Sequence, residues 1–403
     1  MRTAALLCAA LLSAPAARAE VKTYEIGKGL AMLAFGETMI GSRDGYHVAR
    51  LLSVDGHDVW EKDGVELARA EAGVFRHSTG MKTEPALLSA DGKILLHLMT
   101  VHAPDGRTGV AAALNGRPAG GVHAEIKLLS VSPHGQNVAY AARDDAGWSV
   151  HSIQGVGPAL PDAPKYLFLS DSGVLYLTRW KDASWLYRDG APTVSKEFID
   201  MSVSPDLKRV GGVFYTADGQ DWVVVDGAPS GPWTKAHAPV FSDDGGHYAF
   251  LAAKNADGWP DTVVVDGTAR AASPIASRLR VDAAGVPYWQ ASPSGRAGVA
   301  YRDGVALPSS GLLLSEDWIG LSPSGAHYAY WSEDGLIEDG KVAEKAPRPG
   351  MGMPIVFDGE KEFHYITDGL QLVCATVDGS MAARTRCAKV ARTLDKSRAA
   401  KAE

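Results

Sequence analysis

Three features of the sequence predict an all-β fold built from repeated units. A Ser/Asp/Pro/Gly turn followed by an apolar strand recurs along the chain, as in SPHGQNVAY (132–140), SDDGGHYAF (242–250) and SPSGAHYAY (322–330). A second turn, usually Asp-Gly, closes each unit. Forty-four glycines and only 8% aromatic residues indicate many tight turns, and no long stretch from 21 to 380 shows a helical period.

The two turns can be counted independently, and each occurs nine times. The opening turns begin at residues 42, 89, 132, 170, 204, 242, 282, 322 and 357. The closing turns end at Gly64, Gly116, Gly155, Gly190, Gly227, Gly267, Gly304, Gly340 and Gly379. Successive turns lie mostly 34 to 43 residues apart, which is typical of four-stranded propeller blades.

The strands themselves indicate how the units pack. In HYAFLAA (247–253), Tyr248 and Phe250 share one face, and Ala249 and Leu251 share the other. Both faces are apolar, which predicts a sheet that is covered on both sides, as in a propeller rather than in a sandwich. An open β-solenoid is the alternative, although its repeats are usually shorter and stricter.

We therefore predict that residues 20–380 form a single closed β-propeller of four-stranded blades. Eight blades are favoured, with nine or seven as alternatives, because propellers typically have four to eight. A strand from KTYEIGKGLAMLAF (22–35) is expected to complete the last blade and so remove a free sheet edge.

The two ends of the chain differ from the repeats. Residues 1–19 read as a signal peptide with cleavage after Ala19, because Arg2 precedes a short apolar run and Ala17-Arg18-Ala19 is a small-x-small site. This predicts a periplasmic or secreted protein without a transmembrane segment. Acylation of Cys8 is an alternative, disfavoured by the bulky Leu7. Residues 381–403 form a basic, Ala-rich tail that could include a short helix.

Cleavage would leave two cysteines, Cys374 and Cys387. In an oxidising compartment an even pair is expected to form a disulfide. Closing a loop of this size contributes about 3 kcal/mol in the chain-entropy model. The alternative is a pair of buried free thiols.

Composition and motifs give no positive sign of catalysis, of a cofactor or of a metal. A formal net charge of −7 argues against nucleic-acid binding, which depends on basic side chains that neutralise phosphates. The segment GLSPS (320–324) lacks the second glycine of a nucleophile elbow. We therefore predict no catalytic, cofactor-binding or metal-ligating residue and no cofactor.

Histidines are the remaining candidates for chemistry. One stands near the start of the strand after an opening turn in four units, which predicts a structural role for each: His47, His247, His327 and His364. His97, His102 and His123 are near one another in sequence and could meet, but no H-E-x-x-H spacing supports a site.

The repeats quoted above resemble the WD-like repeats of TolB-type bacterial propellers. The resemblance covers nearly all of the chain after the signal peptide and implies an exported propeller that presents loops to a partner. TolB-type proteins carry a separate α/β domain before the propeller, and this sequence has room for only some twenty residues there.

The leading functional hypothesis is an exported, non-enzymatic scaffold that binds a protein or cell-envelope component through one propeller face. The alternative is a hydrolase or lyase acting on a glycan or peptide at the central channel. A third hypothesis is a structural or surface-assembly role in which the basic tail is the point of attachment.

Overall fold

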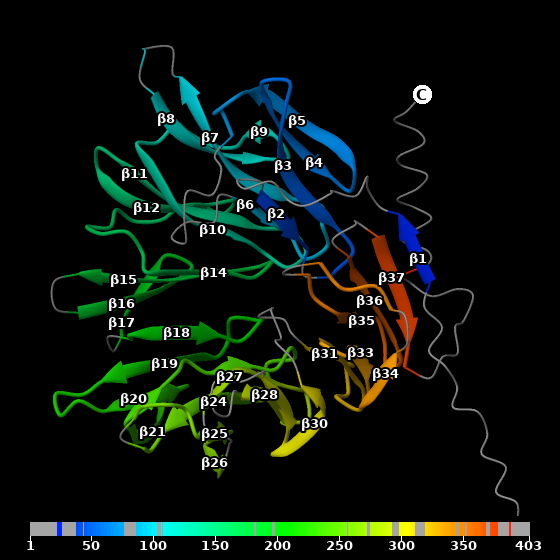
Figure 1. The fold of residues 1–403 in the computed structure, drawn as a ribbon. Coiled ribbons are helices and arrows are strands. Elements are labelled where there is room, and N and C mark those ends of the chain that lie inside the picture. Colours follow the sequence, from blue (N-terminus) through cyan, green and yellow to red (C-terminus); the bar gives the residue numbers. More distant parts are fainter. Residues whose placement is uncertain are drawn as a thin grey trace, which may run out of the picture.

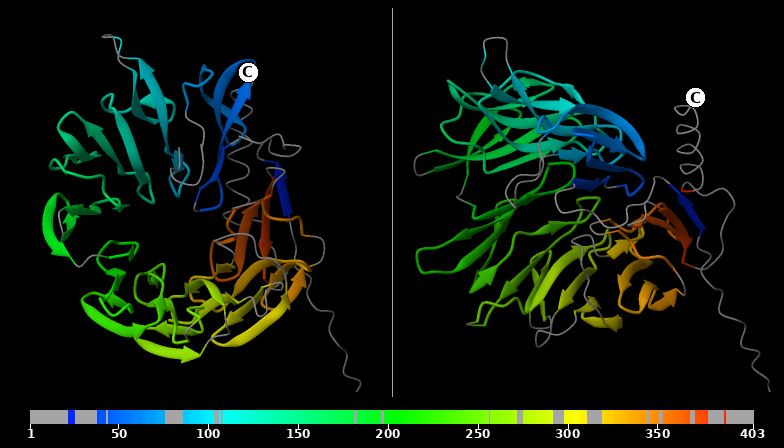
Figure 2. Two further views of the ribbon diagram at one scale, coloured as in Figure 1. Left: turned by 60° about the vertical axis from the view of Figure 1, so that its left-hand side comes forward. Right: turned by 45° about the horizontal axis from the view of Figure 1, so that its top comes forward.

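The chain folds into nine antiparallel sheets that follow one another around a circle (Figures 1 and 2). This computed structural model describes residues 22–25, 38–42, 44–75, 86–102, 106, 108–180, 183–195, 198–255, 257–271, 275–291, 298–310, 319–343, 346–350, 353–367, 371–377 and 387. The predicted signal peptide lies outside these residues, as does the predicted tail apart from Cys387.

The first three sheets each contain four consecutive strands. In order they are β2 (Thr38–Gly41), β3 (Val48–Val54), β4 (His57–Lys62) and β5 (Val65–Glu71); β6 (Ala86–Leu88), β7 (Leu95–His102), β8 (Thr108–Leu114) and β9 (Arg117–Pro118); and β10 (Glu125–Val131), β11 (Val138–Asp144), β12 (Gly147–Ser152) and β13 (Gly155–Val156).

The next three sheets repeat this plan with one interruption. They contain β14 (Tyr166–Leu169), β15 (Val174–Trp180), β16 (Ala183–Arg188) and β17 (Ala191–Ser195); β18 (Asp200–Val203), β19 (Val210–Tyr215), β20 (Asp221–Val225) and β21 (Ala228–Trp233); and β22 (Lys235–Ala236), β23 (Val240–Phe241), β24 (Tyr248–Ala253), β25 (Thr262–Val265) and β26 (Thr268–Ala271). Both β22 and β23 pair with β24. They are two pieces of one first strand, separated at Pro239, which has no N–H to donate.

The last three sheets end with a strand from the other end of the chain. They contain β27 (Ala276–Val281), β28 (Pro287–Ala291), β29 (Val299–Arg302) and β30 (Val305–Ser310); β31 (Ile319–Leu321), β32 (Tyr328–Ser332), β33 (Gly335–Glu338) and β34 (Lys341–Ala343); and β35 (Val356–Phe357), β36 (Glu362–Ile366), β37 (Gln371–Thr376) and β1 (Lys22–Glu25). The predicted N-terminal strand is therefore confirmed as the partner of β37.

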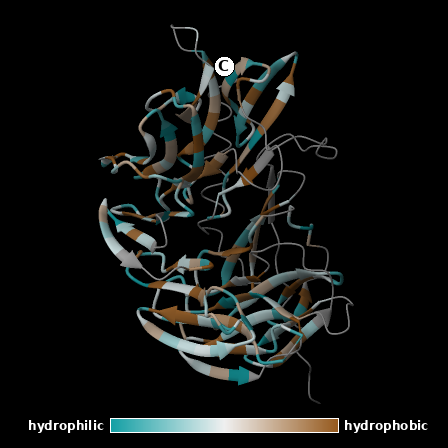
Figure 3. Cartoon of the chain, turned by 90° about the vertical axis from the view of Figure 1, so that its left-hand side faces the viewer, coloured by the Kyte–Doolittle hydropathy of each residue, from teal (hydrophilic) through white to brown (hydrophobic). Residues whose placement is uncertain are grey.

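The circle has nine blades, one for each pair of turns in the sequence, which is the predicted alternative of nine rather than the favoured count of eight. The usual size range of propellers outweighed the count of turns in that prediction. Nine clusters of buried apolar side chains each join two consecutive sheets, and one of them joins the ninth sheet to the first through Tyr46, Val48, Met353 and Ile366. Figure 3 shows the apolar residues running along the strands.

The opening turns of six units are held by a buried serine. Ser42 Oγ donates to Asp44 Oδ1 (2.6 Å) and accepts the His47 N–H (2.9 Å), while Gly45 N–H, at φ 70°, donates to the Ser42 carbonyl. The same acceptance of a strand N–H by the turn serine occurs at Ser89, Ser132, Ser204, Ser242 and Ser322. Ser322, the central residue of GLSPS, is thus a turn residue rather than an exposed nucleophile.

The closing turn explains the recurrent Asp-Gly. In Asp63-Gly64 both residues have positive φ, 53° and 77°, as a two-residue hairpin turn requires. The Asp63 carboxylate also accepts the N–H of Val48 at the start of β3 (2.9 Å). Equivalent pairs with positive φ are Asn115-Gly116, Asp189-Gly190, Asp226-Gly227, Asp266-Gly267, Asp303-Gly304 and Asp339-Gly340.

Antiparallel order divides the loops between two faces of the circle. Both kinds of turn lie at one end of the strands, which we call the turn face. The connections between sheets and the hairpins between second and third strands lie at the other end, which we call the link face. The first strands of five consecutive sheets, β6, β10, β14, β18 and β23, line one hollow on the inner side of the circle, which we call the central hollow.

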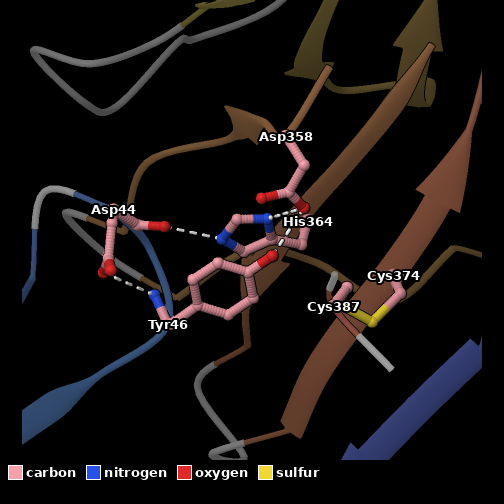
Figure 4. The surroundings of a disulfide bond; sticks show 6 residues. All are labelled: Asp44, Tyr46, Asp358, His364, Cys374 and Cys387. Carbon is pink, nitrogen blue, oxygen red and sulfur yellow. Dashed lines mark hydrogen bonds and ion pairs between the residues drawn. A yellow bond between two sulfur atoms is a disulfide. The ribbon is translucent and has the colours of Figure 1, made fainter. Parts of the chain in front are cut away.

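Histidine and tyrosine join the first sheet to the last (Figure 4). The Tyr46 ring stacks on His364 with centroids 3.6 Å apart, and its hydroxyl donates to Asp358 (2.6 Å). His364 also contacts the Asp44 carbonyl through Nε2 (2.7 Å). Nearby, Cys374 of β37 is disulfide-bonded to Cys387, with Cα atoms 6.0 Å apart. This bond attaches the chain beyond the ninth sheet to the strand that pairs with β1.

No helix among the described residues has both the length and the apolar character needed to cross a membrane.

Candidate functional site

The central hollow lies where the alternative hypothesis placed an enzyme site, and no titratable side chain is among its described lining residues, which come from the second to sixth sheets. It measures about 410 Å³ and is lined by Leu88, Ala90, Ser130, Val131, Pro133, Leu167, Phe168, Leu169, Ser202, Val203, Ser204, Pro205, Leu207 and Phe241. Such a wall offers no group that could act as a general acid or base.

The four repeat histidines occupy structural positions, as predicted. His47 Nδ1 lies 2.8 Å from the carboxylate of Asp63, and His247 and His327 make the same contact with their closing-turn aspartates. His364 contacts Asp358 instead. These four lie in different sheets around the turn face, so they do not converge on one site.

A different group of polar side chains meets on the link face, between the second and third sheets. His123 lies in the connection that leads into β10, and Asp144 is the last residue of β11. His123 Nδ1 is 2.9 Å from Asp144 Oδ1 and 3.0 Å from Oδ2. An ionised carboxylate can only accept hydrogen bonds. The neutral His123 imidazole therefore carries its proton on Nδ1 and has a lone pair on Nε2.

His123 Nε2 has no hydrogen-bond partner although the side chain is only 5% exposed. Unpartnered buried polar atoms are uncommon in proteins and call for an explanation. The backbone around this residue is regular, because the His123 N–H and carbonyl both pair with Val110 of β8. The strand pairing fixes the position of the ring without using its second nitrogen.

A second imidazole completes the group. His151 lies on β12, opposite Tyr140 of β11, and the two rings stack with centroids 5.1 Å apart. The ring centroids of His151 and His123 are 4.7 Å apart. His151 Nε2 contacts Ser149 Oγ (3.0 Å), two residues earlier on the same face of the strand.

Burial and electrostatics favour the neutral form of His151. Burial lowers the pKa of His151, the nearby His123 ring lowers it further, and Asp144 acts in the opposite direction. Two imidazoles and a carboxylate are a set of ligands suited to a metal ion. One ligand atom from each of His123, Asp144 and His151 lies within 4.8 Å of the other two.

A cavity of about 490 Å³ opens beside this group. Its lining contains His123 and Asp144 together with Thr108, Gly109, Val122, Ala124 and Asp145. Position 109 has no room for a side chain, because a Cβ there would lie 2.5 Å from Val122 and 2.7 Å from the His123 carbonyl oxygen. The glycine thus allows the close approach of β8 to the connection that carries His123.

The sequence hypothesis that His97, His102 and His123 meet is not what the structure describes. His97 is fully buried against Trp60 and Phe75 in the core between the first and second sheets. His102 contacts Thr108 across the second hairpin of its sheet. His123 instead meets Asp144 and His151, neither of which the sequence analysis selected. The hairpin of β11 and β12 could have been predicted from the sequence, and it would have placed Asp144 and His151 on neighbouring strands. The path of the connection that carries His123 has no signal in the sequence.

Comparisons with known proteins give little beyond the fold. No family model matches the chain, and no curated protein matches it. Similar solved structures include a eukaryotic initiation factor (12% identity, 78% of this chain and 90% of that chain, TM-score 0.49). They also include the Dos1 propeller (9%, 90% and 95%, TM-score 0.39) and the β-propeller domain of the Trilobed protease from Pyrococcus furiosus (11%, 71% and 90%, TM-score 0.36). With TM-scores below 0.5, none of these carries a functional argument, and the propeller assignment rests on the nine sheets themselves.

Proposed function

We propose that this protein is an exported, non-enzymatic propeller scaffold that binds a protein or cell-envelope partner through its link face. The observation that carries the proposal is the distribution of exposed large apolar side chains. Of the eight in the described residues, four are on the link face: Val122, Ile199, Tyr215 and Trp259. Exposed aromatic residues on loops are typical of protein-binding surfaces.

Three of these four lie on adjacent sheets. Ile199 immediately precedes β18, Tyr215 ends β19 in the same fifth sheet, and Trp259 lies in the hairpin between β24 and β25 of the sixth. Tyr215 and Trp259 are 60% and 58% exposed. The wall of the central hollow, by contrast, gives the hydrolase or lyase alternative no titratable group in its described part.

Export and a kinship with TolB-type propellers are part of the same proposal. The signal-like residues 1–19 and the turn-strand-turn repeats support them, and a disulfide between Cys374 and Cys387 suits an oxidising compartment. Fractionation followed by N-terminal sequencing should find the mature chain outside the cytoplasm, beginning at Glu20. An uncleaved cytoplasmic chain would contradict export.

A pair of matched double variants tests the binding face. Tyr215→Ser with Trp259→Ser removes the two large exposed rings of the link face. Val305→Ser with Val342→Ser removes two side chains of similar exposed fraction, 68% and 50%, from outer strands. Crosslinking and affinity capture from an envelope extract should recover the same partner with the wild type and the outer-strand variant, and at least tenfold less of it with the link-face variant. Equal recovery by both variants, or no partner with the wild type, would refute the proposal.

A further inference from the structure

We propose that His123, Asp144 and His151 bind a divalent transition-metal ion of the Zn²⁺ type at the boundary of the second and third sheets. This site is independent of partner binding, since it concerns other residues and is tested without a partner. The two imidazoles supply nitrogen ligands, and the carboxylate supplies an oxygen.

The fold leaves one possible ligand atom of this group without a partner. His123 is buried, its Nδ1 is engaged by Asp144, and its Nε2 has a lone pair and no partner. When the ion binds at Nε2, the Asp144 carboxylate leaves Nδ1 and turns toward the ion, because a carboxylate on the far side of the ring cannot reach it. The repeat histidines of the turn face lie in separate sheets and lack a second imidazole.

The possible ligand atoms lie close to the spacing that a zinc ion requires. Zinc–nitrogen bonds of about 2.0–2.1 Å place tetrahedral ligand atoms about 3.4 Å apart. The three candidate ligand atoms lie within 4.8 Å of one another, so binding requires the group to contract by about 1.4 Å at most. The side chain of Asp144 can supply this movement, because it is 48% exposed at the end of β11.

The ligand types favour one class of ion, and a cavity gives that ion access to the site. Imidazole ligands suit zinc, copper and nickel, whereas calcium and magnesium prefer oxygen ligands throughout. The cavity of about 490 Å³ touches both His123 and Asp144, which gives a path for the ion and room for a water molecule as a fourth ligand. A site with three protein ligands and one open position is also the form that zinc takes in catalytic centres.

The test is calorimetric titration of the untagged full-length protein with Zn²⁺, repeated with Ca²⁺. We expect one Zn²⁺ per chain and no binding of Ca²⁺. His151→Ala should weaken Zn²⁺ binding at least tenfold, and Asp144→Asn, which keeps the shape of the side chain, should also weaken it. His247→Ala is the matched control, because His247 makes the same contact with an aspartate (2.6 Å) but has no second imidazole; its affinity should equal that of the wild type.

Thermal unfolding with and without Zn²⁺ gives a second readout. The wild type and His247→Ala should gain melting temperature with Zn²⁺, since a ligand that binds only the folded state stabilises it. His151→Ala should gain much less. If His151→Ala fails to fold, His151→Gln takes its place. Equal Zn²⁺ affinity in the wild type, His151→Ala and Asp144→Asn would overturn the proposal, as would no Zn²⁺ binding by the wild type.

Discussion

Histidine–aspartate contacts occur on both faces of this propeller, and the two sets differ in what surrounds them. On the turn face, each oxygen of Asp266 has its own structural donor: Oδ1 accepts the Tyr248 N–H and Oδ2 contacts His247. On the link face, both oxygens of Asp144 face the same nitrogen of His123.

The difference teaches that a residue pair does not define a role by itself. In the closing turns the pair is explained once the hairpin is built, because the aspartate fixes a turn with positive φ and holds the start of a neighbouring strand. In the His123 group, by contrast, the buried Nε2 of His123 has no partner, and the imidazole of His151 lies beside it. Counting the partners of each polar atom separates the two sets.

The largest expected effect on stability comes from His97, a buried imidazole with no carboxylate partner among its described contacts. Burial lowers the pKa of His97 to about 4, from an ordinary value of 6.5. Between pH 6.5 and pH 4, His97 is therefore protonated more often in the unfolded chain than in the folded chain. As pH falls through this range, protonation of His97 lowers the free energy of unfolding from its value at neutral pH. The loss approaches about 3 kcal/mol.

His97→Phe should remove this acid sensitivity, since a phenyl ring suits the contacts with Trp60 and Phe75. Chemical denaturation of the wild type and the variant at pH 7, 5.5 and 4.5 measures it. The stability of the variant relative to the wild type should rise steadily toward acid. A constant difference across the three values would show that His97 does not titrate in this way.

Asp266→Ala tests the turn-face contacts, with an expected loss of about 2 kcal/mol. The change removes acceptors for the Tyr248 N–H and for His247, and it places alanine at φ 47°. Asp266→Asn is the control, because Asn115 already fills the equivalent position in the second sheet and accepts the Leu95 N–H. Urea denaturation should rank the wild type and Asn close together and Ala well below; equal losses for Ala and Asn would contradict this account of the turn.

Tyr46→Phe tests the contact between the first and last sheets and should cost about 1 kcal/mol, because Asp358 loses the donated hydroxyl bond of 2.6 Å. Tyr176→Phe is a matched control, as the hydroxyl of Tyr176 is buried without a partner. Its removal should be neutral or slightly stabilising in the same denaturation experiment. A loss at Tyr176 as large as at Tyr46 would mean that the hydroxyl bond is not the cause.

Asp144→Ala should have the smallest effect on folding, about 1 kcal/mol or less in the absence of metal, because it removes the acceptor of the buried His123 Nδ1 but the half-exposed position lets water take its place. It serves no backbone N–H among the described hydrogen bonds. Thermal unfolding in the presence of a chelator measures this. A loss as large as that of Asp266→Ala would show that the link-face group also maintains the architecture, and it would erase the contrast between the faces.

The sequence was sufficient for the fold because the turns carry local signals. Asp-Gly favours a turn with positive φ, and the serine of an opening turn accepts the N–H of the following strand. Both turns can therefore be recognised in the sequence, and nine pairs of them predict nine units. The pairing of β1 in the last sheet was also predicted, and Thr38–Gly41 supplies the first sheet with a first strand of its own.

The candidate site could not be predicted in the same way. His123 reaches Asp144 and His151 only because the connection into β10 runs antiparallel to β8 at Val110, and that pairing leaves no motif in the sequence. Nearness in the chain suggested His97 and His102 instead. Strand register places those two elsewhere, one in the core and one on its own hairpin.

The ninth sheet combines a strand from each end of the chain, and this orders events in time. During synthesis the first eight sheets can form while the ninth does not yet exist, and β1 has no partner until β37 is made. The pairing then joins segments more than 300 residues apart, which is a slow, non-local step. Until that step the growing protein is an arc whose two end sheets are unpacked, so their apolar faces can bind chaperones or misassemble. The arc becomes a ring only when the last strand has paired.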